Sequence, residues 1–357
     1  MKKFEDKKSA LSRNANSNGE HENIWTEKPR MVKQFIENRP DYERLCAEVA
    51  YILSRTLKNA CIEFSAITHR AKTLDSFLEK IQRKTYDDPI KRITDFAGVR
   101  VVCLYVDDLL KIENIVSEHF EVIEKIDKSN DKKIDNFGYG AIHFVVRLGK
   151  NSSGARYDDL KNLVCEIQIR TVLQDAWAII DHHLVYKNEM NVPSVLRKKL
   201  HLLSETFESA DEEFQQIRKE RQEYLFEIEE SEISPEQFLE NELNLDSFVR
   251  YAQWKFPALP SGTNVVDAPF FLDPILKSGF QKLYDLDAAV QKGIRIYDQY
   301  VAQKGRDFFN SNAITSVIAA LFFVNKNFTP AEHINQLFPK YAEFARTQRL
   351  FDKEFLT

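Results

Sequence analysis

The segment that most constrains the fold lies near the middle of the chain, at residues 163–169, and reads LVCEIQI. Apolar and polar residues alternate in it, which is the pattern of a β-strand with one buried face. The buried face would carry the side chains of Cys165, Ile167 and Ile169. The other face would carry an acid, an amide and a guanidinium, those of Glu166, Gln168 and Arg170. A polar face in contact with solvent explains this pattern as well as a binding site does. Residues elsewhere in the sequence must therefore distinguish the two interpretations.

Two more runs have the composition of strands, VRVVCLYV at 99–106 and AIHFVVRL at 141–148. Both are rich in β-branched residues, and clusters of Gly, Asn, Asp and Ser bound them. A helical pattern from Leu109 to about His119 separates the two runs. The order of these elements predicts an α+β fold in which helices flank a mixed β-sheet.

Helices are predicted before and after these strands. The segment from Trp25 to about Lys84 is predicted to be helical. Its clearest part repeats apolar residues at i, i+3, i+4 and i+7, namely Leu74, Phe77, Leu78 and Ile81. Thr171, with Gln174 three residues later, resembles a capping box, so the strand at 163–169 should lead into a helix that reaches about Lys187.

The chain has 357 residues, which exceeds the usual size of one domain, so two domains are expected. Residues 1–24 are rich in Asn, Ser, Lys and Glu and are predicted to form a disordered tail. Ser234-Pro235 marks the expected boundary between a first domain, residues 25–233, and an all-helical accessory domain, residues 234–357.

An apolar stripe in the first domain follows the alternating spacing of four and three residues that is typical of coiled coils. It consists of Leu196, Leu200, Leu203, Phe207, Ala210, Phe214 and Ile217. Packing within the chain explains this stripe, and so does an interface between subunits. The second interpretation predicts a homo-oligomer.

Composition narrows the function classes. The net charge of −5 means that the chain as a whole does not attract nucleic acids. Binding of a nucleic acid would therefore require a local basic patch. No run of about 18 apolar residues could span a membrane, and the polar N-terminus lacks a signal-peptide core. The 4 cysteines stand singly, without the spacing of metal ligands. We therefore expect a cytoplasmic protein without membrane association.

Two acids are predicted to meet at one end of the sheet. Asp95 precedes the strand at 99–106 in a turn, and if that strand neighbours 163–169, its carboxylate lies near Glu166. Two carboxylates in this position suit Mg²⁺, which takes few protein oxygens and completes its shell with water and phosphates.

Other polar residues suit a nucleotide. Arg70, Lys72 and Ser76 lie together at the predicted start of the amphipathic helix, where two cations and a hydroxyl would hold a polyphosphate. A solvated helix start explains these residues equally well. Tyr139 stands between two glycines, free to stack on a flat ring, and His143 follows four residues later.

Four segments together resemble the synthetase domain of the RelA/SpoT alarmone synthetases: THRAKTLDSFLEKI, YDDPIKRITDFAGVRVV, FGYGAIHFVV and CEIQIRTVLQDAWAIIDHHLVYK. They follow the order and spacing of the family, and the resemblance covers about residues 25–225. It implies a nucleotidyltransferase-like mixed sheet flanked by helices. It also implies a GTP pyrophosphokinase, which makes (p)ppGpp for the stringent response by moving the β,γ-pyrophosphate of ATP to the 3′-hydroxyl of GDP or GTP. No hydrolase domain is expected, because residues 1–68 are too few to form one.

The resemblance implies roles for residues on the ATP side. Arg70 and Arg100 would hold the adenine between their guanidinium planes. Lys72 and Ser76 would bind the ATP phosphates. The sequence contains no Walker A glycine loop, and this chemistry does not require one.

The resemblance also implies roles at the metal and on the acceptor side. Asp95 and Glu166 would bind Mg²⁺, and Glu166 is in addition the candidate base for the attacking hydroxyl. Tyr139 would stack on the acceptor base, and His143 would contact the acceptor phosphates or the reacting centre. Three more polar residues would line the acceptor side, Gln168, Arg170 and Asp181.

One motif departs from the family. The pattern Gly-Tyr-Arg/Gln-Ser-Leu/Ile-His reads GYGAIH here, so Gly140 and Ala141 replace the Arg/Gln and the Ser. This departure motivates a second hypothesis, in which the same chemistry acts on the 3′ end of tRNA or on an adenine nucleotide, in a toxin or defence protein. A third hypothesis is a catalytically silent nucleotide-binding module that acts through its C-terminal half.

Overall fold

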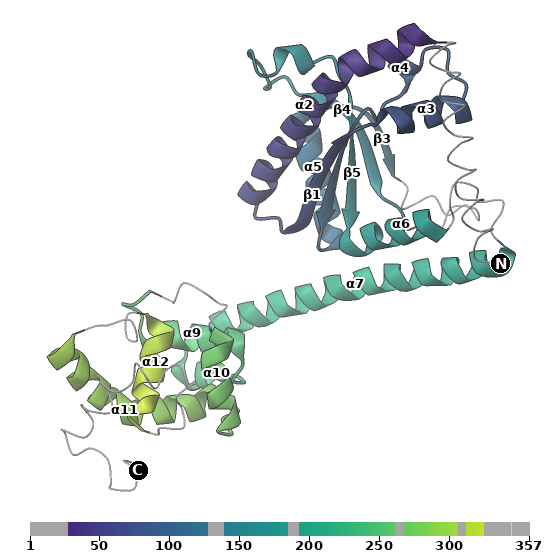
Figure 1. The fold of residues 1–357 in the computed structure, drawn as a ribbon. Coiled ribbons are helices and arrows are strands. Elements are labelled where there is room, and N and C mark those ends of the chain that lie inside the picture. Colours follow the sequence, from purple (N-terminus) through teal and green to yellow (C-terminus); the bar gives the residue numbers. More distant parts are fainter. Residues whose placement is uncertain are drawn as a thin grey trace, which may run out of the picture. The chain divides into compact units, whose positions relative to one another are not determined.

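The computed structural model forms two compact units, Met1–Arg218 and Lys219–Thr357 (Figure 1). It describes residues 28–127, 139–184, 193–260, 268–305, 312–324 and 344. The division between the units falls within the long helix α7 (Ser194–Ser231), upstream of Ser234-Pro235. The predicted tail at 1–24 lies outside the described residues. Among the helices that are described, none is long and apolar enough to cross a membrane.

The first unit is built on a five-stranded mixed sheet, which confirms the predicted α+β class. Its strand order is β1-β2-β5-β4-β3. β2 and β5 pair in parallel, and the other neighbours pair antiparallel. The strands are β1 (Phe64–Ala71), β2 (Ala97–Cys103), β3 (Phe120–Asp127), β4 (Ile142–Leu148) and β5 (Cys165–Thr171).

Helices cover the sheet and connect its strands. α2 and α5 pack against several strands, and their apolar side chains form one core with the inward-facing residues of β2, β4 and β5. α3 adds Phe77 and Leu78 to this core, as its predicted periodicity requires. The helices of this unit upstream of α7 are α2 (Pro29–Asn59), α3 (Leu74–Arg83), α4 (Pro89–Arg92), α5 (Val106–His119) and α6 (Val172–Leu184).

The prediction of continuous helical structure up to Lys84 is wrong, because β1 interrupts it. Helix α2 ends at Asn59, and Cys61 then takes a positive φ of 54° that turns the chain. β1 is an edge strand in which only Ala71 is fully buried, so its sequence lacks the strict alternation of a half-buried strand. Arg70 consequently lies in a strand rather than at a helix start. The other edge strand, β3, was not predicted either and is similarly exposed.

The junction between β5 and α6 follows the predicted capping pattern. The backbone N–H of Thr171 donates to Gln174 Oε1 at 3.0 Å, and the backbone N–H of Gln174 donates to Thr171 Oγ1 at 3.0 Å. Two reciprocal bonds fix the angle at which the strand enters the helix. The part of the predicted helix beyond Leu184, including Lys187, lies outside the described residues.

The second unit is helical in its described residues, as predicted. Its core is rich in aromatic side chains, and α12 is buried along its whole length. Gly293 of α11 permits close contact with α12, since a Cβ there would lie 1.9 Å from the carbonyl oxygen of Ala320. Its helices beyond α7 are α8 (Pro235–Leu239), α9 (Leu245–Lys255), α10 (Ala268–Lys277), α11 (Leu283–Lys304) and α12 (Ala313–Phe322).

The apolar stripe on α7 is only partly covered within the first unit. Leu200 and Phe207 pack against Tyr139 and Trp177, which supports the intramolecular interpretation for these two positions. The remaining large side chains of the stripe are about half exposed, those of Leu196, Leu203, Phe214 and Ile217. The homo-oligomer therefore stays a prediction.

An ion pair joins α7 to α5 within the first unit. Asp108 is fully buried, and its Oδ2 accepts from Arg218 Nη1 at 2.8 Å. The Arg218 guanidinium also lies 4.3 Å from the ring centroid of Tyr105. The second oxygen of Asp108 pairs with Lys111 at 2.8 Å.

We expect the substitution Arg218→Met to lower the free energy of unfolding by about 2–3 kcal/mol, because it leaves a buried carboxylate with one partner instead of two. The exposed neighbour Lys219 supplies the control, since Lys219→Met should change the free energy by less than about 1 kcal/mol. Urea denaturation of the three proteins measures both values. Equal stability of the two variants would contradict a role for this ion pair.

Candidate functional site

The polar face of the sheet forms the floor of the candidate site. β5 alternates as predicted, with Cys165, Ile167 and Ile169 fully buried in the core. The parallel register of β2 and β5 places Gly98 beside Glu166. Partners across a sheet share a face, so side chains from four strands lie together. They are Arg70, Arg100, His143, Glu166, Gln168 and Arg170.

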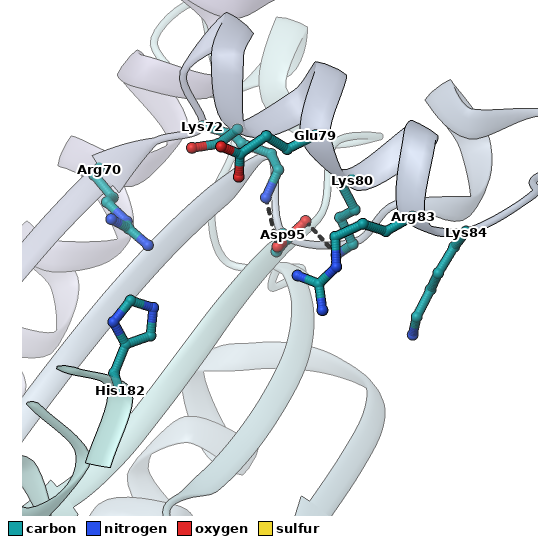
Figure 2. A pocket seen from close by; sticks show the side chains of 9 residues that line it. Arg70, Lys72, Glu79, Lys80, Arg83, Lys84, Asp95 and His182 are labelled. Carbon is teal, nitrogen blue, oxygen red and sulfur yellow. Dashed lines mark hydrogen bonds and ion pairs between the residues drawn. The ribbon is translucent and has the colours of Figure 1, made fainter. Parts of the chain in front are cut away.

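A cavity of about 630 Å³ adjoins this floor and is lined largely by cations (Figure 2). Lys72 and Ser76 line it, as the sequence predicts. Three further cations that were not predicted line the cavity, Lys80 and Arg83 of helix α3 and Lys84 directly after its end. Within the helix, Lys80 and Arg83 follow Ser76 by four and seven residues, which places these three side chains along one helix face. This spacing was the signal that could have revealed them.

Asp95 lies between two lysines of this cavity. Its Oδ2 is 2.9 Å from Lys72 Nζ, and its Oδ1 is 2.9 Å from Lys80 Nζ (Figure 2). Burial alone would raise the pKa of Asp95, but the two ammonium groups outweigh it and hold the pKa below its ordinary value. Asp95 is therefore ionised at neutral pH.

Glu166 contacts His143, the neighbouring polar residue on β4. The distance from His143 Nδ1 to Glu166 Oε1 is 2.5 Å, and Gln168 Nε2 donates to the same oxygen at 3.4 Å. Burial would raise the pKa of Glu166, but the hydrogen bond and charge of His143 lower it overall. The carboxylate is thus held ionised beside a histidine.

The two carboxylates line one smaller cavity of about 120 Å³, together with Gly98 and Gln168. The structure thus brings Asp95 and Glu166 together as the sequence predicts. The described residues contain no group of three or more His, Cys, Asp or Glu that could hold a metal alone. Two carboxylates are nevertheless a suitable donor set for Mg²⁺, which binds through one or two carboxylates and the phosphates of a substrate. Their role as metal ligands stays a prediction.

The two arginines predicted to hold adenine line a third cavity, of about 200 Å³. Arg70 comes from β1 and Arg100 from β2, and their strand partners place them on the same face. Gly98 and Gln168 complete the floor between them. Arg100 donates to Asp175 Oδ1 of α6 at 3.0 Å, a contact that the sequence analysis did not predict.

Tyr139 is not free to stack in this structure, in contrast to its prediction from the flanking glycines. Tyr139 is only 7% exposed, because Trp177 of α6 and Phe207 of α7 cover its ring. Its hydroxyl donates to Asp211, and Thr171 Oγ1 donates to the same oxygen at 2.6 Å. Tertiary packing causes this burial, because α7 is distant in the sequence from the glycines that flank Tyr139. Its role toward an acceptor base stays a prediction.

The end of α6 contributes two neighbouring polar residues. His182 lines the cation-rich cavity (Figure 2). Asp181 is half buried on the same helix. Arg170, which is predicted to line the acceptor side, contacts Asp175 at 3.4 Å and Gln168 at 3.3 Å, and its role toward an acceptor stays a prediction.

Carboxylates and cations on the polar face of a mixed sheet are the arrangement expected of an enzyme that transfers phosphate groups. Comparison with known proteins narrows this class. The family model described as "Region found in RelA / SpoT proteins" matches residues 69–191. GTP pyrophosphokinase YjbM of Bacillus subtilis (strain 168) is 34% identical over 165 residues, which are 45% of this chain and 74% of the relative.

A second relative, GTP pyrophosphokinase YwaC of the same strain, is 31% identical over 156 residues, or 42% of this chain and 72% of the relative. Among solved structures, the small alarmone synthetase 1 from Bacillus subtilis bound to its product pppGpp covers 53% of this chain and 98% of its own, with 30% identity and a TM-score of 0.45. The match to YjbM establishes the family. The chain belongs to the RelA/SpoT family of enzymes, together with these GTP pyrophosphokinases.

Gly98 offers a test of the candidate cavity. A Cβ at this position would lie 3.8 Å from the carbonyl oxygen of Arg70, which is ordinary contact, so strand β2 can accept a side chain. We expect Gly98→Val to fold stably but to fill the cavity beside Glu166 and weaken ATP binding roughly 10- to 100-fold. Calorimetric titration with ATP and a thermal melt measure the two effects. Gly98→Ala, with its smaller side chain, should weaken binding less; unchanged ATP affinity in Gly98→Val would rule out this cavity.

Asp211 should make stability depend on pH. Burial raises its pKa, even though Thr171 and Tyr139 donate hydrogen bonds to it. Its protonated form therefore contributes stability that is complete below the ordinary aspartate pKa of about 4 and is lost as pH rises through the raised pKa. Asp211→Asn keeps an accepting oxygen without the charge and should escape this loss.

The measurement is the free energy of unfolding of wild type and Asp211→Asn in urea, followed by tryptophan fluorescence between about pH 4 and pH 8. The advantage of the variant should grow as pH rises. Glu213→Gln, an exposed position on the same helix, is the matched control and should show no such trend. A constant difference between wild type and Asp211→Asn would contradict the raised pKa.

Proposed function

We propose that this chain transfers the β,γ-pyrophosphate of ATP to the 3′-hydroxyl of GDP or GTP, and so makes guanosine 3′-pyrophosphates as stringent-response signals. The observation that supports this most is the meeting of Asp95 and Glu166 in a cavity beside Lys72 and Lys80. The relatives YjbM and YwaC carry the name of this activity.

The cation-rich cavity suits the triphosphate of ATP. Lys72 and the α3 cations Lys80 and Arg83 would neutralise its oxygens, and Ser76 would donate a hydrogen bond. In the adjoining cavity, Arg70 and Arg100 would contact the adenine ring. Asp95 and Glu166 would hold Mg²⁺, which supplies charge neutralisation on the transferred phosphates when bound.

The reaction forms a bond between the acceptor 3′-oxygen and the β-phosphorus, and it breaks the bond from that phosphorus to the oxygen that leaves with AMP. The hydroxyl proton passes to the pair formed by Glu166 and His143, whose 2.5 Å contact lets the charge be shared. Because no covalent enzyme intermediate is needed, catalysis consists of positioning and charge stabilisation.

The acceptor is the part of the proposal that the sequence leaves open. Gly140 and Ala141 cannot supply the side-chain contacts of the residues they replace in the family motif. The 3′ end of tRNA or an adenine nucleotide is therefore the second candidate acceptor. A silent module would bind ATP and show no product with any acceptor.

Purified protein with ATP and Mg²⁺ should form a 3′-pyrophosphorylated product with GDP or GTP. We expect Asp95→Asn and Glu166→Gln each to reduce the rate by at least about 10²–10³-fold without unfolding the chain, because each removes a charge at the reacting phosphates. Glu118→Gln, an exposed acid on α5, is the control and should retain the wild-type rate.

Chromatography of reactions with GDP, GTP, adenine nucleotides and tRNA in parallel measures the products. If product forms only with tRNA or only with adenine nucleotides, that molecule is the acceptor and GDP or GTP is not. The absence of any product would exclude the activity.

A further inference from the structure

Asp175 occupies a central position that the proposed roles do not use. It lies in the first turn of α6, four residues after the end of β5. The reciprocal hydrogen bonds between Thr171 and Gln174 fix this turn against the strand. The Asp175 carboxylate is consequently held at the edge of the polar sheet face.

One oxygen of Asp175 contacts two arginines from different strands. Its Oδ1 is 3.0 Å from Arg100 Nη1 on β2 and 3.4 Å from Arg170 Nη1 on β5. These strands are parallel neighbours, so the two guanidinium groups lie on one face. Arg100 is assigned to ATP in the proposed function, and the family resemblance implies that Arg170 lines the acceptor side.

The arrangement needs a negative charge between the arginines. Burial and the charge of Arg100 lower the pKa of Arg170, and Asp175 opposes both effects. The buried Nε atoms of Arg100 and Arg170 have no hydrogen-bond partner among the described residues. Within the same residues, Asp175 is the hydrogen-bond partner that orients the Arg100 guanidinium.

The contacts continue from Arg170 to the reacting centre. Arg170 Nη2 donates to Gln168 Oε1 at 3.3 Å, and Gln168 Nε2 donates to Glu166 Oε1 at 3.4 Å. Asp175 thus stands at the head of a chain of polar contacts that runs from the ATP-side arginine to the catalytic carboxylate. A nucleotide that holds Arg100 in one orientation would therefore also hold Asp175, Arg170 and Gln168 in place before the second nucleotide binds.

We propose that Asp175 is a positioning residue that holds Arg100 and Arg170 in one arrangement and thereby couples the binding of ATP to the binding of the acceptor. The inference rests on the proposed function, which assigns Arg100 to ATP, and on the acceptor role that the family resemblance implies for Arg170. The first nucleotide orders the shared carboxylate, so the second binds to a site that is already ordered. The coupling is reciprocal, because each nucleotide must strengthen the other by the same factor.

The test is a calorimetric titration of the full chain with Mg²⁺ and an ATP analogue that carries a methylene bridge between the α- and β-phosphates, with and without saturating GDP. In wild type, GDP should lower the Kd of the analogue several-fold. In Asp175→Asn, which keeps the shape but loses the charge, this ratio should fall to about one. The KM values for ATP and GDP should each rise about tenfold, the effect of losing a charge-assisted hydrogen bond, and more than kcat falls.

Three further variants separate positioning from folding. Asp175→Glu keeps the charge and should restore a ratio above one. Asp175→Ser places an uncharged oxygen on the same turn and replaces the asparagine variant if that protein melts below the assay temperature. Asp107→Asn, an exposed acid in the first turn of α5, should retain the wild-type coupling.

Coupling in Asp175→Asn equal to that of wild type overturns the inference, and so does a wild type without coupling. The proposed function fails separately. If wild type couples the two nucleotides through Asp175 but forms no pyrophosphorylated product, the positioning role stands and the activity is rejected. If product forms while Asp175→Asn keeps wild-type coupling and KM values, the activity stands and the positioning role is rejected.

Discussion

The parallel pairing of β2 with β5 is the constraint on which the site depends. It sets Gly98 beside Glu166, which leaves an open space where most residues would place a side chain. The same register sets Arg100 beside Gln168 and brings the turn at Asp95 to the cavity that Glu166 lines. A slip of β5 by one residue would turn Glu166 and Gln168 into the core, because strand side chains alternate between faces.

Charge balance explains why so many ionic groups can lie together on this face. Asp95 is held between two lysines, and Asp175 lies between two arginines, so each carboxylate offsets a pair of cations. A lone buried charge would be strongly unfavourable, whereas neighbouring charges of opposite sign offset one another.

The sequence predicts this site better at its centre than at its borders. Strand β5 is buried on one face and polar on the other, so the two-residue alternation of its sequence predicts the strand. The same alternation places Glu166 and Gln168 together on the polar face. The edge strand β1 lacks that contrast, so its sequence resembles a helix, although its Arg70 does line the cavity. The contacts of Asp175 and Tyr139 depend on tertiary packing, which no local period records.

The two sides of the site rest on different packing. The residues proposed for ATP come from β1, β2 and α3, whose inner faces belong to the main core of the first unit. Tyr139 belongs to a separate small cluster with Trp177 and Leu200, on helices α6 and α7. This cluster and the main core have no residue in common, so we expect a change in the cluster to disturb the core beneath the residues proposed for ATP only weakly. The departures at Gly140 and Ala141 fall beside Tyr139, so under the proposed function a change of acceptor would not require a change in the residues proposed for ATP.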